Sequence, residues 1–261
     1  MNQLEILRES LGQCDEIILD ALIMRNRIVE DIMAYKEANG LQILQPEQEA
    51  KQKEWLENRM EGRCHKDEVA DVFECIRTNS KRIQARKLFN YNIVLIGFMG
   101  SGKSTISDFL KNVFAMDVVE LDQIIAERQG MSISDIFETY GEQYFRDLET
   151  NLLIEMQSRS NVVISYGGGT PMRECNVVEM KKNGRVVLLT AKPETILDRV
   201  KDNHDRPLIE NNKTVPFIAD LMEKRRAKYE AAADIIIETD GKSELEICEE
   251  LVHRLRTIDE K

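Results

Sequence analysis

Residues 92–105, NIVLIGFMGSGKST, indicate the fold of the larger part of this chain. The stretch begins with a short apolar run rich in β-branched side chains, which is typical of a buried strand. The pattern G-x-x-x-x-G-K-[ST] then runs from Gly97 to Ser104, and residues 105–114 have the spacing of a helix. Strand, glycine turn and helix in this order predict a phosphate-binding loop. The alternative is a glycine turn that matches the pattern by chance.

The spacing of this loop suits a nucleoside triphosphate with Mg²⁺. Glycines let successive backbone N–H groups turn toward one phosphate, and the N-terminus of the next helix adds partial positive charge. Lys103 can reach the β- and γ-phosphates, and the Ser104 hydroxyl can ligate the metal. We expect the nucleotide to be bound by Gly100, Ser101, Gly102, Lys103, Ser104 and Thr105.

The composition limits the size, the location and the partners that we expect for this protein. The 261 residues, 42% hydrophobic and 32% charged, suffice for one large domain or two modest ones. No apolar run approaches the ~20 residues that span a membrane, and the N-terminus lacks a signal-peptide core, so we expect a cytoplasmic protein. Five scattered cysteines without a CxxC pair indicate reduced thiols. The net charge of −11 argues against a nucleic-acid partner.

The first ninety residues predict a helical domain. Apolar residues recur at helical spacing from Leu4 to Ile32, and the pattern stops at Gly40. A helix over residues 3–39 would be ~55 Å long, too long for a small unit to cover alone. We therefore expect a homodimer formed through residues 1–90. Two more helical segments follow, at residues 46–61 and 67–89.

Cations fall on the apolar stripe of the first helix. Arg25 lies seven residues from Ile18 and from Ile32, and Lys36 lies eleven residues beyond Arg25, on nearly the same face. A cation on a core-facing stripe is costly unless an anion meets it. The alternative is that these long side chains extend to water.

Six polar residues extend this pattern on both sides of the Gly40 break: Arg8, Arg25, Lys36, Glu49, Ser80 and Gln84. Their order and spacing resemble the all-helical class of chorismate mutase, an intertwined dimer of three-helix chains. The resemblance implies that Arg25 and the Arg8 of the other chain bind the two carboxylates of chorismate. Lys36 and Gln84 would meet the ether oxygen, where charge develops during the rearrangement to prephenate, and Glu49 and Ser80 would complete the pocket.

This resemblance is incomplete at two positions. Gln45 and Gln48 stand where the family usually has an Asp and an Arg. The missing cation and hydroxyl acceptor leave two expectations open. Residues 1–90 either catalyse the rearrangement or form a non-catalytic module that senses chorismate or prephenate, or only dimerises.

From residue 91 onward, apolar strand-like runs alternate with helical segments. This alternation predicts a parallel sheet covered on both faces, with ligands at the carboxyl ends of its strands. The expected fold is thus an α/β domain with a five-stranded parallel sheet, residues 91–261, after a three-helix domain, residues 1–90. The expected strands are residues 93–96, 118–121, 162–165, 186–189 and 235–237.

Several polar groups gather at these strand ends. Glu120 and Asp122 close the second expected strand on one face, which suits Mg²⁺ binding and proton abstraction, although a solvated strand end is the alternative. Arg146 and Glu149 lie three apart on one helix face, as in an ordinary surface ion pair. Residues 167–169 are three glycines that allow close backbone approach to a ligand, or form only a flexible turn.

Four arginines in an acidic chain indicate an anionic substrate besides the nucleotide. Arg199 precedes a polar stretch, residues 201–214, that looks like a mobile lid, and Arg206 lies within this stretch. Arg225 lies on the helix after it, and Arg146 lies on an earlier one.

The motifs GFMGSGKST, Asp122, GEQYFR, GGGTP, RPL and Arg225-x-x-x-Tyr229 occur in that order. Together they resemble shikimate kinase along residues 91–261. The resemblance implies ATP and Mg²⁺ as cofactors and shikimate as substrate, with Asp122 as catalytic base, Arg206 and Lys103 at the transferring phosphate, and Arg199 on adenine. The implied shikimate site consists of Asp122, Arg146, Glu149, Gly167, Gly168, Gly169 and Arg225.

The metal site departs from this family at one residue. Glu120 stands where an Asp is usual, so we expect Ser104 and Glu120 to hold Mg²⁺ with one longer side chain. The alternatives for this domain are another small-molecule kinase, such as a gluconate-type enzyme, or a nucleotide-driven switch.

Overall fold

The structure, a computed structural model, describes residues 2–201 and 212–259. The chain divides into two compact units, Met1–Lys87 and Leu88–Lys261. In the described ranges, no helix is both long enough and apolar enough to cross a membrane.

The first unit is helical, as the sequence predicts. It consists of α1 (Gln3–Ala38), α2 (Pro46–Met60) and α3 (Lys66–Leu88). A capping box starts α1, because Glu5 N–H donates to Asn2 Oδ1 at 2.9 Å and Asn2 N–H donates to Glu5 Oε2 at 2.8 Å. The helix ends before Gly40, whose φ of +60° continues poorly into a helix. Pro46 then occupies the first turn of α2.

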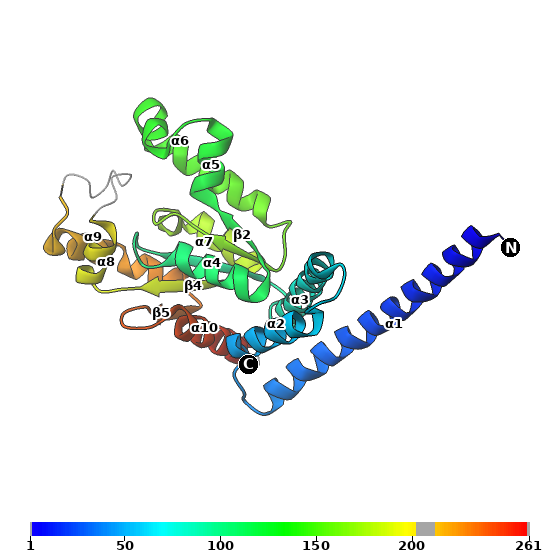
Figure 1. The fold of residues 1–261 in the computed structure, drawn as a ribbon. Coiled ribbons are helices and arrows are strands. Elements are labelled where there is room, and N and C mark those ends of the chain that lie inside the picture. Colours follow the sequence, from blue (N-terminus) through cyan, green and yellow to red (C-terminus); the bar gives the residue numbers. More distant parts are fainter. Residues whose placement is uncertain (1, 202–211, 260–261) are drawn as a thin grey trace. The chain divides into compact units, whose positions relative to one another are not determined.

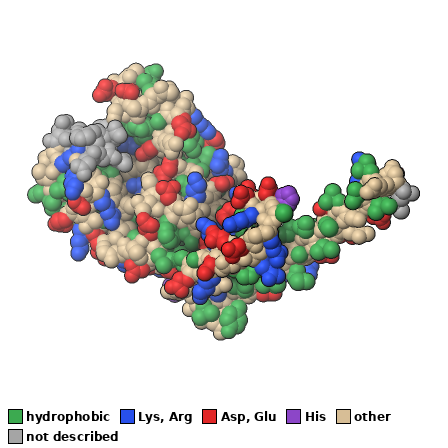
Figure 2. Space-filling model, in the orientation of Figure 1, with side chains coloured by type: hydrophobic (Ala, Val, Ile, Leu, Met, Phe, Trp, Pro, Cys, Tyr) green, Lys and Arg blue, Asp and Glu red, His purple; other side chains and the backbone are tan. Residues whose placement is uncertain are grey.

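Most of the apolar side chains of α1 are exposed. Only Val29 and Met33 are buried in this helix, whereas Leu7, Leu11 and Ile18 are 60%, 62% and 56% exposed. Figure 2 shows hydrophobic side chains along the whole length of the helix. The described part of the first unit therefore leaves a long apolar surface on α1 uncovered.

The second unit contains the predicted five-stranded parallel sheet (Figure 1). The strand order β2-β3-β1-β4-β5 puts β1 at the centre, with Val94 opposite Ile164 on one side and Val186 on the other. The carboxyl ends of β1 and β3, where the two glycine-rich loops follow, are thus adjacent. The strands are β1 (Asn92–Gly97), β2 (Asp117–Glu120), β3 (Val162–Ser165), β4 (Gly184–Thr190) and β5 (Ile235–Glu238).

Helices cover both faces of this sheet. Val94 and Ile96 point into a core shared with α6 (Ile133–Met156), α7 (Glu174–Lys182) and α9 (Val215–Ala232). The alternating residues of β1 point to the opposite face, where α4 (Lys103–Phe114) lies against β1, β2 and β3 and contacts α10 (Glu244–Asp259). The remaining elements are α5 (Leu121–Gln129), the short 3₁₀ helix η1 (Thr170–Met172) and α8 (Pro193–Val200).

One strand end differs from the prediction. The second strand ends at Glu120, and the buried Leu121 already begins α5, so Asp122 lies in the first turn of a helix. The expectation that Glu120 and Asp122 share one strand face is therefore wrong. Leu121 extended the apolar run in the sequence, but its burial comes from the helix rather than from the strand.

Candidate functional site

The phosphate loop folds as its glycines require. Gly100 and Gly102 have φ of +75° and +98°, which favours glycine over residues with a side chain. The helix after the loop starts at Lys103, two residues earlier than the sequence predicts, so Lys103 and Ser104 belong to its first turn. Lys103 Nζ donates to Gly97 O at 3.1 Å and to Phe98 O at 3.2 Å. The ammonium group therefore lies across the loop that would surround a phosphate.

The two predicted metal ligands lie together at the mouth of this loop. Burial raises the pKa of Glu120, while hydrogen bonds from the Ser165 and Ser104 hydroxyls and the charge of Lys103 act in the opposite direction. Across residues 2–201 and 212–259, no cluster of three or more His, Cys, Asp or Glu could hold a metal alone. A hydroxyl with one carboxylate nevertheless fits Mg²⁺, which takes most of its ligands from substrate phosphates and water.

The glycine loop after β3 brings the predicted substrate residues together. A β-carbon on Gly167 would lie 2.7 Å from Asp122 Oδ1 and 3.1 Å from Glu149 Oε1. On Gly169 it would overlap the Arg146 guanidinium group. Both glycines are therefore needed because the side chains approach the backbone so closely.

The glycine loop, residues 167–169, also contacts α9 and the phosphate loop. Tyr229 OH donates to Gly168 O at 2.6 Å, and Arg225 Nη1 donates to the same oxygen at 3.4 Å. A β-carbon on Gly168 would lie 3.5 Å from Gly97 O, so the two glycine-rich loops are neighbours. The Arg225 guanidinium lies 5.9 Å from the centre of the Phe98 ring.

Arg146 and Glu149 form a buried ion pair. Arg146 Nη1 is 2.6 Å from Glu149 Oε2, and Glu149 has no exposed surface. The Thr170 hydroxyl donates to the other carboxylate oxygen, and Glu142 holds the outer side of Arg146 at 2.9 Å. Burial raises the pKa of Glu149, although the Arg146 and Thr170 contacts lower it. The spacing predicted the pair, but the surface alternative is wrong because Thr170 in η1 covers this face of α6.

Arg199 lies beside the phosphate loop. Its Nη1 donates to Gly100 O at 3.0 Å and to the buried Thr239 hydroxyl at 3.2 Å. Its predicted contact with adenine stays a prediction. Arg206 lies outside the described residues.

Some residues at this site were not found from the sequence. Thr170 and Ser165 contact the two carboxylates, and Thr239 orients Arg199. Thr170 directly follows the three glycines and Ser165 ends a strand, so their positions in the sequence could have identified them as site residues. Thr239 could not have been identified in this way, because an isolated threonine after a strand is common.

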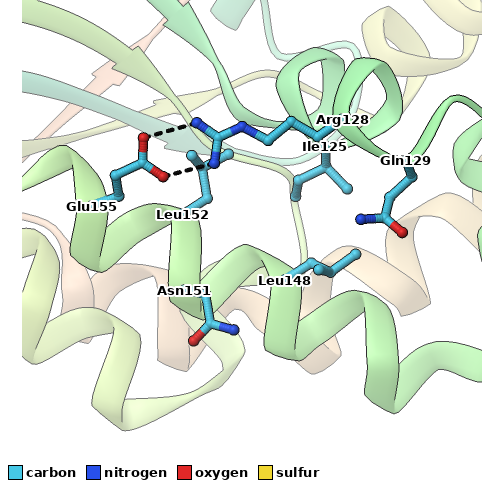
Figure 3. A pocket seen from close by; sticks show the side chains of 7 residues that line it. All are labelled: Ile125, Arg128, Gln129, Leu148, Asn151, Leu152 and Glu155. Atoms are coloured by element: carbon cyan, nitrogen blue, oxygen red, sulfur yellow. Dashed lines mark hydrogen bonds and ion pairs between the residues drawn. The ribbon is translucent and has the colours of Figure 1, made fainter.

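A separate pocket of about 100 Å³ lies between α5 and α6 (Figure 3). Arg128 spans its edge and forms hydrogen bonds of 2.6 Å and 2.8 Å with Glu155. The pocket is lined by Ile125, Arg128, Gln129, Leu148, Asn151, Leu152 and Glu155. It contains none of the predicted site residues, so it does not mark the active site.

In the helical unit, the structure joins Arg25 to Ser80. Arg25 Nη1 donates to Ser80 Oγ, and Ser80 Oγ donates to Ile76 O at 2.9 Å. Burial and the neighbouring charge of Arg77 lower the pKa of Arg25. Arg25 is half-buried, so the alternative of a cation extended into water is wrong for this residue.

The other predicted residues of this unit are distributed over three helices. Lys36 Nζ donates to Ile43 O at 2.9 Å, and Glu49 Oε2 is 2.8 Å from Lys81 Nζ, next to Ser80 in the chain. Gln84 lies one helical turn beyond Ser80 on α3. Arg8 precedes Arg25 by 17 residues of one helix, which corresponds to about 25 Å. The structure therefore does not bring Arg8 to Arg25 within one chain.

The geometry of the second unit defines a class of protein. A phosphate loop next to an arginine-lined glycine loop, with a carboxylate between them, is the arrangement of a P-loop kinase that acts on a small anionic molecule. Comparison with known proteins specifies the family. A family model for shikimate kinase matches residues 99–256, and the chain belongs to the shikimate kinase family, whose members use ATP.

Similar proteins agree with this assignment. The shikimate kinase of Persephonella marina is 42% identical over 165 residues, 63% of this chain and 99% of the relative. That of Geobacter sulfurreducens is also 42% identical and is covered to 91%. The shikimate kinase of Acinetobacter baumannii in complex with shikimate has a TM-score of 0.62 at 30% identity, with 66% and 96% of the two chains covered. The Aquifex aeolicus structure has a TM-score of 0.57 at 36% identity, with 64% and 98% covered.

A second family model explains the helical unit. The model for chorismate mutase type II matches residues 7–85, so the chain carries a domain of that kind before the kinase. Both resemblances that the sequence indicated are thereby confirmed.

Proposed function

We propose that residues 91–261 transfer the γ-phosphoryl group of ATP to a hydroxyl of shikimate and that residues 1–90 convert chorismate to prephenate. One observation gives the first proposal its main support. Asp122, Arg146 and Arg225 meet around three glycines directly beside the phosphate loop. This arrangement suits a small carboxylate with ring hydroxyls.

The side chains of the kinase site would have distinct roles. Arg146 and Arg225 would bind the carboxylate of shikimate, since guanidinium groups match its planar geometry. Asp122 would accept a hydrogen bond from the reacting hydroxyl and take its proton as the oxygen attacks phosphorus. Lys103 would neutralise charge on the transferring phosphate, as would Arg206. Arg199 would bind adenine, because it lies beside Gly100 at the edge of the phosphate loop.

Mg²⁺ would be held by Ser104 and Glu120. When bound, the ion would neutralise charge on the β- and γ-phosphate oxygens. Ser104 would ligate it directly from the first turn of α4, and Glu120 would hold one of its water ligands. The hydrogen bonds from Ser104 and Ser165 already orient the Glu120 carboxylate for this task.

Asp122→Asn tests the proposed base. We expect ATP binding to change little and the rate of shikimate phosphorylation to fall about 10²–10⁴-fold, the usual contribution of general acid–base catalysis. Asp108→Asn, at an exposed position of α4, is the matched control with normal rates. Near-normal turnover by Asp122→Asn would remove Asp122 as base. ATP consumption that does not depend on shikimate would favour another substrate.

The helical unit requires a second copy for its proposed function. Arg8 and Arg25 lie about 25 Å apart on one helix, so they can bind one ligand only if Arg8 comes from another chain. The uncovered apolar side chains of α1 support such a homodimer, because burying them against a second α1 would be favourable.

Leu11→Glu together with Ile18→Glu tests the dimer. A charge at these two exposed apolar positions should convert a dimer into a monomer in light scattering and abolish chorismate conversion while kinase activity persists. A wild-type chain that is monomeric at micromolar concentration would contradict the proposed assembly.

Gln45 and Gln48 favour a second candidate function for the helical unit. With one cation and one hydroxyl acceptor fewer than the family usually has, the unit could bind chorismate or prephenate without converting it. Loss of chorismate absorbance in the presence of the whole chain would support the mutase. A change in kinase rate upon chorismate addition, without chorismate loss, would support a sensor.

We propose the cytoplasm as the location of the chain. All five cysteines lie in the described residues as free thiols, which a reducing compartment favours.

A further inference from the structure

The helical unit contains two cations that the chorismate mutase resemblance does not assign. Arg77 and Lys81 lie on α3, four residues apart and therefore on one face of that helix. Ser80, the partner of Arg25, is three residues from Arg77 and adjacent to Lys81. The side chains of Arg77 and Lys81 are only 16% and 22% exposed. Such burial is unusual for side chains that serve solubility alone.

Lys81 connects α3 to α2. Its Nζ lies 2.8 Å from Glu49 Oε2, and Glu49 is one of the residues predicted to complete the pocket. Gln48, next to Glu49, occupies the position where the family usually has an arginine. Lys81 thus supplies positive charge beside Glu49 from a different helix.

Arg77 lies on α3 near Arg25, whose pKa is lowered by burial and by the charge of Arg77. Its Nε and Nη2 donate to Glu74 at 3.1 Å and 2.5 Å, which leaves the N–H groups of Nη1 for another acceptor. Arg25 forms its hydrogen bond with Ser80, and no carboxylate among residues 2–201 and 212–259 pairs with it. The repulsion between Arg25 and Arg77 contributes to the lowered pKa of Arg25. A bound carboxylate would relieve this repulsion.

The charges of this cluster suit a dicarboxylate. Arg25, Lys36, Arg77 and Lys81 stand against Glu49 and Glu74, which leaves two net positive charges. A dicarboxylate would balance these two charges. The Arg8 of a second copy would add a further cation.

We propose that Arg77 and Lys81 bind the carboxylates of the ligand in the helical unit, and that Lys81 replaces the cation missing at Gln48. This inference rests on the proposed function of residues 1–90, because it concerns the same site. With Lys81 in this role, the pocket has as many cations as the family pattern, although Gln48 replaces the usual arginine. Gln48 alone is therefore no argument that the unit is a sensor.

The test uses the full-length chain with chorismate as the probe. Conversion is followed by absorbance, and binding is followed by calorimetry. For Arg77→Gln and for Lys81→Gln we expect KM and Kd for chorismate to rise tenfold or more with a smaller change in kcat, because a charged hydrogen bond to a carboxylate is lost. Lys81→Arg, which keeps the charge, should restore most of the affinity.

The controls separate this inference from the proposed function. Arg82→Gln removes the same charge at an exposed position of α3 and should leave KM unchanged. Circular dichroism of each variant reports that the three helices of the first unit have folded. If Arg25→Ala abolishes conversion but Arg77→Gln and Lys81→Gln keep KM within twofold, the inference is overturned and the proposed function stands. If the wild type neither binds nor converts chorismate, both are overturned.

Discussion

Glu149→Gln tests how the kinase site orients its substrate. The substitution keeps the shape of a side chain with no exposed surface and removes its charge. Glu149 contacts Arg146 at 2.6 Å, so the change weakens the interaction that fixes the guanidinium from the inner side. Hydrogen bonds to charged groups contribute about 1.5–3 kcal/mol and neutral ones about half of that, a difference of roughly tenfold in affinity.

We therefore expect KM for shikimate to rise about tenfold, with a smaller change in kcat and in KM for ATP. A coupled assay of ADP release gives all three values. Glu142→Gln is the matched control, because Glu142 contacts the same arginine at 2.9 Å but is 66% exposed. A surface ion pair contributes about 0–1 kcal/mol, so KM should stay within about threefold.

The free energy of unfolding should change less in Glu149→Gln than KM for shikimate does. Burial raises the pKa of Glu149, so its charged form costs more in the folded state than in the unfolded chain. A neutral Gln removes this cost, which offsets the weaker contact with Arg146. The free energy of unfolding at pH 7.5 should therefore stay within about 1 kcal/mol of the wild type. The contribution of Glu149 in the wild type is fully present below its usual pKa of 4.5 and is lost as pH rises through the raised value. Urea unfolding at several pH values should show that Glu149→Gln lacks this loss. An unchanged KM, or a loss above about 3 kcal/mol in the free energy of unfolding, would contradict this role of Glu149.

Three further predictions concern single positions. Gly169→Ala places a β-carbon on the Arg146 guanidinium, so KM for shikimate should rise tenfold or more in the ADP-release assay. Gly12→Ala is the control, because a β-carbon at Gly12 would meet no atom within 4 Å. It should leave KM unchanged. Lys103→Met removes the ammonium group that lies across the phosphate loop, and kcat should fall about 10²-fold or more in the same assay. Burial raises the pKa of the Cys248 thiol to about 12, so a thiol reagent at pH 8 should label Cys248 only after unfolding. The exposed Cys64 and Cys175 should be labelled in the folded chain, and mass spectrometry distinguishes the sites.

The fold could be predicted because its signals are local. Apolar runs of strand length, a glycine loop and helical spacing determine the sheet and the three N-terminal helices without long-range information. Asp122 was placed wrongly because Leu121 can end a strand or begin a helix equally well. Only the packing of α5 distinguishes the two.

The sequence could predict which residues form the site, but not how each of them is buried and bonded. Helical spacing indicated that Arg146 and Glu149 would meet, but the burial of Glu149 depends on Thr170, which is 21 residues away and in another element. The link from Lys81 to Glu49 joins two helices and has no counterpart in sequence spacing. Contacts between elements are thus the information that a single sequence does not contain.

We propose that one chain carries two separate catalytic sites. The most direct measurement compares the rates of shikimate phosphorylation and chorismate loss in the wild type, Asp122→Asn and Arg25→Ala. We predict that Asp122→Asn loses only the first activity and Arg25→Ala only the second. A wild type without chorismate loss, or a single substitution that abolishes both activities in a folded chain, would contradict the presence of two separate sites.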